Sequence, residues 1–159
     1  FGFFMKKISI VFGCGGHRAQ ASRFYQIFSA DGDTEFYGIT DEGDSPDWCK
    51  SFLVLEHFRD KYSGRLVSPI KFISNVRKAY KFLRDNNIST VVSFGPGVAI
   101  FVGVAAKLTG CSIIHFETWS KFYSPTITTK VMKYLTKNIF IQNAELIDAI
   151  PYGQYVGRF

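Results

Sequence analysis

Apolar runs that end in glycine alternate with stretches of helical period along this chain, and that alternation limits the folds open to it. The first run, "ISIVFGCGGH", predicts a buried strand over Lys6–Phe12 that enters a glycine turn and stops at a histidine. A helix over His17–Ser29 and a second strand over Thr34–Thr40 follow. Buried strands that alternate with helices are typical of a parallel sheet covered on both faces. We therefore predict a Rossmann-like α/β fold.

The rest of the sequence continues the alternation. Its clearest helix is predicted over Pro69–Asp85, with an apolar stripe at helical spacing that begins with Ile70 and Ile73. The other predicted elements are a short segment around Phe52–Leu55, strands over Ser89–Phe94, Cys111–Glu117 and Asn138–Gln142, a helix over Val98–Leu108, and a last short strand at Tyr155–Phe159.

Two neighbouring residues mark the start of a later helix. Serine is a favoured N-cap and proline is favoured at the first helical position. We therefore predict that Ser124 caps this helix, that Pro125 is its first residue, and that it runs to about Thr136.

Length and composition predict one domain. A chain of 159 residues, of which 47% are hydrophobic, is long enough to bury a core of its own, so we treat residues 1–159 as a single Rossmann-like domain. Phe1–Phe4 precede a natural start at Met5 and are interpreted as a cloning remnant or as the end of a trimmed apolar anchor. The longest apolar stretch, Val91–Ala106, is interrupted by glycine and proline and is too short to span a membrane.

The charge of the chain is uneven and indicates an anionic partner. Residues 1–60 carry 6 Lys/Arg and 9 Asp/Glu, whereas residues 61–159 carry 13 and 4. A basic second half favours phosphate, acidic lipid or nucleic acid as a partner, and the sequence lacks the stacking motif expected of a nucleic-acid binder. The three cysteines form no CxxC pair, so we predict reduced thiols, no disulfide framework and no metal site.

Three turns are predicted to meet at one edge of the sheet, because ligands of such folds sit at the carboxyl ends of the strands. They are Gly13–His17, Gly95–Gly97 and Glu117–Lys121. A dinucleotide fingerprint would need a third glycine where the chain has Arg18, and no Gly-Lys-Ser/Thr follows as in a P-loop. We therefore predict no dinucleotide cofactor. The first turn is either a cradle for an anionic group at a helix N-terminus or only a tight corner.

Two polar residues of these turns are candidates for chemistry. His17, at the predicted helix N-terminus, is a general base, an anion ligand or a polar cap. Glu117 ends an apolar strand and is either a base or hydroxyl acceptor, or a structural partner of Lys121 or of a helix N-terminus. His115 in that strand is interpreted as a core histidine, and His57 is assigned no role.

Four segments together resemble one family. They are "FGCGGH", "SFGPGVAIFVGVAAKLTG", "IIHFETWSK" and "YVGRF", and their order is similar to that in the acceptor-side, membrane-associated subunits of two-chain GT-B glycosyltransferases. Those subunits include PssD/CpsF-type exopolysaccharide proteins and the membrane subunit of the eukaryotic dolichol-linked chitobiose N-acetylglucosaminyltransferase. The Gly-Gly-His turn is more distantly similar to that of MurG. The resemblance implies a fold equivalent to the N-terminal half of a GT-B enzyme.

The resemblance also implies roles for individual residues. His17 and Glu117 would be the catalytic groups nearest the attacking sugar hydroxyl. The other residues implied at the acceptor diphosphate and sugar are Gly13, Gly15, Gly16, Arg18, Gly95, Pro96, Gly97 and Ser120. The basic residues that would face the membrane are Arg77, Lys78, Lys81 and Arg84, with a second basic group at Lys121, Lys130, Lys133 and Lys137.

The function that these features favour is a subunit of a bacterial exopolysaccharide or capsule glycosyltransferase that is inactive alone. It would bind an undecaprenyl-diphosphate-linked acceptor at the cytoplasmic face of the membrane, as a peripheral protein, and activate a separate nucleotide-sugar-binding partner. No cofactor, metal or nucleic acid is expected. The alternative is a stand-alone nucleotide-binding or regulatory Rossmann module.

Overall fold

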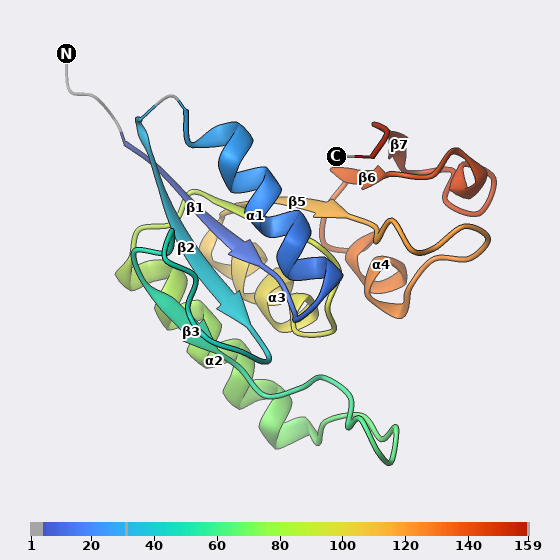
Figure 1. Ribbon diagram of the computed structural model, residues 1–159. Helices are drawn as coiled ribbons and strands as arrows, with labels where there is room; N and C mark the ends of the chain where they lie inside the picture. Colours follow the sequence, from blue (N-terminus) through green and yellow to red (C-terminus); the bar gives the residue numbers. More distant parts are fainter. Residues whose placement is uncertain (1–4, 31, 159) are drawn as a thin grey trace.

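Seven parallel strands form one sheet in the order β3-β2-β1-β4-β5-β6-β7 (Figure 1). The computed structural model describes residues 5–30 and 32–158, so the predictions for Phe1–Phe4 lie outside the described residues. The strands are β1 Lys6–Val11, β2 Thr34–Thr40, β3 Phe52–Val54, β4 Thr90–Ser93, β5 Ser112–Phe116, β6 Ile139–Ile141 and β7 Gln154–Tyr155. The helices are α1 Gly16–Phe28, α2 Pro69–Asp85, α3 Ala99–Thr109 and α4 Ile127–Met132, with a short 3-10 helix at Ala144–Leu146.

Alternate residues of the central strands supply two separate cores. On β1, Ile10 and Phe12 pack with α1 on one face, whereas Val11 between them packs with α2 and α3 on the other. The same period of two holds on β4, where Val92 faces α1 and Val91 faces α2 and α3. Figure 1 shows α1 on the near face of the sheet and α2 and α3 on the far face. The predicted Rossmann-like α/β fold is confirmed.

The order of the strands reverses at the centre of the sheet. β1 pairs with β2 on one side and with β4 on the other, and the chain builds outward from each. The turns that leave β1 and β4 therefore diverge to opposite faces and leave a crevice between them at the carboxyl edge. These are the turns Gly13–His17 and Gly95–Gly97.

The prediction for the start of α4 is wrong by two residues. The helix is capped by Thr126, whose side chain accepts a hydrogen bond from the backbone N–H of Thr129, and its first residue is Ile127. The cause lies elsewhere in the chain, because the Glu117 carboxylate accepts a hydrogen bond from the Thr126 N–H at 2.7 Å. That contact holds Thr126 in an extended conformation, so the helix begins after it rather than at Pro125. The helix also ends at Met132, before the predicted end at Thr136.

Two residues of the predicted apolar stripe on α2 do not face the core. Ile70 and Ile73 are 82% and 64% exposed, and the buried positions of the helix are Asn75, Ala79, Phe82 and Leu83. The reason is that the first turns of α2 extend past the ends of the strands, as Figure 1 shows at the lower end of this helix. The last predicted strand is shorter than expected and covers only Gln154–Tyr155. No helix within the described residues is long and apolar enough to cross a membrane.

The capping geometry of α4 gives a direct test of the corrected helix start. Replacing Thr126 by alanine removes the cap and the hydroxyl that donates to Glu117, so we expect the free energy of unfolding to fall by about 1–2 kcal/mol. Ser124→Ala is the matched control, because Ser124 is exposed and does not cap the helix, and it should change stability by less than about 0.5 kcal/mol. Urea denaturation of the two variants measures both values. The reverse order of effects would restore Ser124 as the cap.

Candidate functional site

Side chains from three loops gather around Gly13 at the crevice. A β-carbon added to this glycine would lie 3.4 Å from Cβ of Pro96, 3.6 Å from Oδ1 of Asp41 and 3.7 Å from Cδ2 of His17. These residues follow β4, β2 and β1 respectively, with His17 in the first turn of α1. The site is therefore built at the topological switch point of the sheet, where α/β folds of this kind bind ligands.

The turn leaves the N-terminus of α1 open. Gly15 has a φ of 64°, a left-handed conformation that favours glycine, and it turns the chain into the helix. No side chain among the described residues caps the helix, and its first intrahelical hydrogen bond is donated by Ala19 to Gly15. The N–H groups of the first turn therefore point toward the crevice with the positive end of the helix dipole. Such an arrangement binds anions.

His17 lies between the two glycine turns. A β-carbon at Gly95 would lie 3.6 Å from Cε1 of the His17 ring and 3.7 Å from the carbonyl oxygen of Phe116. The backbone of Gly95 has a φ of 101°, which again favours glycine. The Nδ1 atom of His17 is buried and has no hydrogen-bond partner among the described residues. Buried polar atoms are nearly always paired, so the unpaired imidazole nitrogen makes His17 a candidate for contact with a ligand.

Glu117 is placed differently from His17. It is fully buried, and its carboxylate accepts hydrogen bonds from the N–H of Thr118 at 2.8 Å, from the N–H of Thr126 at 2.7 Å and from the hydroxyl of Thr126 at 3.2 Å. Of the two alternatives for this residue, the structure shows the contacts of the second, a partner of a helix N-terminus. Its carboxylate ties the loop after β5 to the start of α4.

A neutral histidine connects the two sides of this region. Nδ1 of His115 lies 3.1 Å from the hydroxyl of Ser93, which also accepts from the N–H of Gly95, and Nε2 lies 2.7 Å from the hydroxyl of Thr129. Burial, with a smaller contribution from the nearby His17, lowers the pKa of His115 to about 3. The interpretation of His115 as a core histidine agrees with its complete burial.

Three other predicted site residues, Gly16, Arg18 and Ser120, lie in or near the loops around the crevice. Gly16 faces Nε1 of Trp119 at 3.4 Å from a notional β-carbon, and the guanidinium of Arg18 donates to the carbonyl of Asp44 at 3.0 Å. Ser120 is exposed and hydrogen-bonds Thr118.

Gly97 ends the second glycine turn and packs on Phe58, whereas the predicted basic residues lie on α2. A β-carbon at Gly97 would come within 2.9 Å of Cβ of Phe58, so this glycine is required for packing. Arg77, Lys78, Lys81 and Arg84 are exposed on the outer face of α2, away from the core that it shares with α3.

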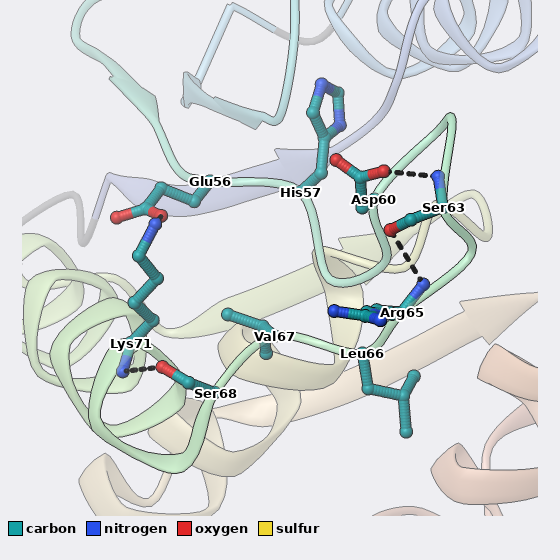
Figure 2. Close-up of a pocket in the computed structure, with 9 residues that line it drawn as sticks. All are labelled: Glu56, His57, Asp60, Ser63, Arg65, Leu66, Val67, Ser68 and Lys71. Atoms are coloured by element: carbon teal, nitrogen blue, oxygen red, sulfur yellow. Dashed lines mark hydrogen bonds and ion pairs between the residues drawn. The ribbon is translucent and has the colours of Figure 1, made fainter.

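A contact between a carboxylate and an imidazole, which the sequence does not predict, flanks the turn. Oδ2 of Asp41 lies 3.2 Å from Nδ1 of His57, a residue that was assigned no role. His57 also lines a cavity of about 430 Å³ between the loop after β3 and the start of α2, which Figure 2 shows with Arg65, Leu66 and Lys71. The signal for Asp41 was its position directly after a strand; His57 carries no comparable signal.

A second missed feature is a buried chain of amides below the turn. Gln20 of α1 donates to Gln142 at 3.1 Å, and Gln142 donates to the carbonyl of Glu117 at 3.0 Å. This chain links the helix that carries His17 to the loop after β5.

Part of the sequence is similar to a known glycosyltransferase. No family model matches the sequence. Over 87 residues, or 51% of the chain, it is 33% identical to a UDP-N-acetylglucosamine--N-acetylmuramyl-(pentapeptide) pyrophosphoryl-undecaprenol N-acetylglucosamine transferase from Psychrobacter cryohalolentis. The match covers 24% of that enzyme, so the chain is similar to a minor part of its length.

Solved structures show the same fold. MurG of Acinetobacter baumannii superimposes with a TM-score of 0.68 at 16% identity, over 88% of this chain and 42% of that one. A UDP-GlcNAc 2-epimerase from Methanocaldococcus jannaschii superimposes with a TM-score of 0.64 at 12% identity, over 91% and 42%. The fold is therefore that of the N-terminal half of GT-B glycosyltransferases, and the chain spans less than half the length of these structures.

The buried His115 predicts a particular pH dependence of stability. Its pKa is lowered in the folded state, so only the unfolded state takes up a proton as the pH falls from 6.5 toward 3, and stability is lost over that range. Between pH 6.5 and 5 we expect this residue to account for a loss of about 2 kcal/mol. The free energy of unfolding of wild type and of His115→Asn should therefore differ in slope over that range.

The slope rather than the absolute stability is the relevant quantity, because the substitution also removes two buried hydrogen bonds. If the variant does not fold, NMR titration of the wild-type ring gives the same information. A ring of His115 that takes up a proton near pH 6.5 would contradict this prediction.

Proposed function

We propose that this chain binds a lipid-linked sugar diphosphate as the acceptor half of a GT-B glycosyltransferase. The observation that carries the proposal is the buried, unpaired Nδ1 of His17 beside the uncapped N-terminus of α1. The partial identity to an enzyme that transfers N-acetylglucosamine to pyrophosphoryl-undecaprenol supports a diphosphate as the anion. The turn does not match a dinucleotide-binding fingerprint, because Arg18 stands where the third glycine would be.

In this proposal the glycine turn binds the diphosphate and His17 is the general base. The N–H groups of Gly15, Gly16 and the following first turn hold the diphosphate. His17 accepts the proton of the acceptor hydroxyl while the hydroxyl oxygen bonds to the anomeric carbon of the donor sugar and the nucleoside diphosphate leaves with the bonding electrons. Glu117, enclosed by Thr118 and Thr126, acts as a positioning residue that fixes the loop beside the turn.

The start of α2 is the surface that we propose for contact with the membrane. Leu66, Ile70 and Ile73 are 63%, 82% and 64% exposed. The start of α2 lies at the carboxyl edge of the sheet, where β1 and β2 end (Figure 1). Farther along the helix, Arg77, Lys78, Lys81 and Arg84 are exposed. Apolar side chains next to basic ones favour the surface of an anionic bilayer. A lipid acceptor held there would have its tail in the membrane and its diphosphate near the turn.

A separate chain would supply the nucleotide-sugar site. The support for a two-chain enzyme is the resemblance of four segments of the sequence to the acceptor-side subunits of such enzymes. We propose that this chain is inactive alone, acts at the cytoplasmic face of the membrane in exopolysaccharide or capsule synthesis, and activates a nucleotide-sugar-binding glycosyltransferase subunit. Its acceptor would be undecaprenyl-diphosphate-linked.

Calorimetric titration with farnesyl diphosphate, a short soluble probe, tests the acceptor site. We expect the wild-type chain to bind this probe, and His17→Ala to weaken binding at least about tenfold because it removes a polar group from the turn. Lys107→Ala is the matched control: this cation lies in the last turn of α3, at the opposite edge of the sheet, and its loss should leave the affinity unchanged.

The same titration discriminates between the two functions. Binding of UDP-N-acetylglucosamine or NAD in preference to farnesyl diphosphate would support a stand-alone nucleotide-binding module instead. Equal affinities of wild type and His17→Ala for farnesyl diphosphate would remove His17 from the acceptor site.

Flotation with vesicles of phosphatidylglycerol and phosphatidylcholine tests the membrane surface. Replacing Ile70 and Ile73 together by serine removes apolar area that would enter the bilayer, so the bound fraction should fall about tenfold or more. Ile27→Ser is the control, because Ile27 is similarly exposed, at 57%, but lies on α1. An equal loss with Ile27→Ser would show that the start of α2 is not the contact.

A further inference from the structure

We propose that Asp41 binds a hydroxyl of the acceptor sugar at this site and that His57 positions its carboxylate. The inference rests on the proposed function, and it identifies the residue that distinguishes a sugar-linked lipid diphosphate from a free one. Neither residue belongs to the site predicted from the sequence.

The first step is the position of Asp41. It follows β2, and its Oδ1 lies 3.6 Å from the point where a β-carbon of Gly13 would be; Cδ2 of His17 lies 3.7 Å from the same point. The carboxylate and the imidazole therefore flank one glycine from two sides. A ligand that reaches the imidazole across Gly13 is within reach of Asp41 as well.

The second step is availability. The carboxylate of Glu117 already accepts three hydrogen bonds and is fully buried, whereas the side chain of Asp41 is 16% exposed. Among the described residues, Asp41 has one polar partner, the Nδ1 of His57 on its Oδ2, and its Oδ1 accepts no hydrogen bond. The carboxylate of the neighbouring Glu42 already has two partners, the ammonium of Lys61 and the thiol of Cys14, which donates to its Oε2 at 3.7 Å. Asp41 is therefore the carboxylate of the turn that can accept a hydrogen bond from a ligand.

The third step is the support that His57 gives. Leu55 donates its N–H to the carbonyl of Thr40, so the end of β3 lies beside the end of β2 and brings His57 next to Asp41. Figure 2 shows the His57 ring turned away from Lys71, whose ammonium pairs with Glu56 instead. Beyond His57 the loop is fixed by Asp60, which accepts hydrogen bonds from the N–H groups of Tyr62 and Ser63. The chain on both sides of His57 is thus fixed, and the Nδ1 contact at 3.2 Å can orient the carboxylate of Asp41.

The fourth step is chemical selectivity. A carboxylate next to a diphosphate site repels the anion, so it weakens the binding of any diphosphate that does not donate a hydrogen bond to it. A sugar hydroxyl donates a hydrogen bond to the carboxylate, and a bond to a charged acceptor is among the stronger ones available. Asp41 therefore disfavours the sugar-free lipid diphosphate and favours the sugar-linked one.

Two probes separate these effects: farnesyl diphosphate and farnesyl diphosphate linked to N-acetylglucosamine. Wild type should bind the sugar-linked probe more tightly. In Asp41→Asn we expect the ratio of the two affinities to fall about tenfold, while farnesyl diphosphate itself binds as tightly as before or more tightly. If Asp41 had only a structural role, the substitution would weaken the binding of both probes. The diagnostic result is therefore a loss of affinity for the sugar-linked probe without a loss of affinity for farnesyl diphosphate.

Substitutions of His57 test the positioning role. His57→Phe removes the group that contacts Asp41 and should lower the same ratio, whereas His57→Asn keeps a donor near the position of Nδ1 and should restore most of it. Glu56→Gln is the control, because it removes a neighbouring charge that is paired with Lys71 and should leave the ratio unchanged.

The outcomes distinguish this inference from the proposed function. If wild type binds neither probe, the proposed acceptor site fails and this inference fails with it. If wild type binds both probes but does not prefer the sugar-linked one, or if Asp41→Asn keeps the wild-type ratio, the acceptor site stands and the role of Asp41 is overturned. A parallel loss of affinity for both probes in Asp41→Asn would likewise overturn it.

Discussion

The parallel pairing of β1 with both β2 and β4 is the constraint on which the site depends. Because the chain leaves β1 toward one face of the sheet and leaves β4 toward the other, the two glycine turns separate, and His17 of α1 lies between them. β2 ends beside β1, so the acid that follows it reaches the same space. The candidate site is thus a consequence of strand order, and each loop contributes one functional group.

The buried polar groups behind the turn give this edge of the sheet its shape. His115 connects the loop after β4 to α4 through Ser93 and Thr129, and Glu117 connects the loop after β5 to the start of the same helix. Buried polar networks of this kind are stabilising only when their members are paired, and then they fix one arrangement. The loops around His17 are therefore fixed by the buried hydrogen bonds of His115 and Glu117 rather than by contacts within the crevice.

Much of the fold could be predicted from the sequence because its signals are local. Strands such as Thr34–Thr40 and helices such as α2 follow from the spacing of apolar residues within each element, and the three turns follow from where those strands end. The errors come from contacts between different elements. The start of α4 is displaced by Glu117, nine residues earlier, and the exposure of Ile70 depends on how far α2 extends beyond the sheet. The pair of Asp41 and His57 was missed for the same reason, since it forms only once β3 pairs with β2.

Buried polar atoms without a hydrogen-bond partner lower the stability of a fold, so their positions bear on function. Among the described residues they are the hydroxyl of Ser9, Nδ1 of His17 and Oε1 of Gln20. Each such atom lowers stability by about 1–3 kcal/mol when nothing pairs with it. Two of the three lie within one turn at the start of α1, the same turn whose N–H groups are uncapped. In a core without a binding role, we expect apolar side chains in place of unpaired polar ones. The presence of two unpaired polar side chains at the start of α1, beside the crevice, therefore favours a binding role over a structural one. The fold tolerates them because the aromatic packing of Phe24 on Phe94 and Phe116 secures the rest of that helix to the sheet.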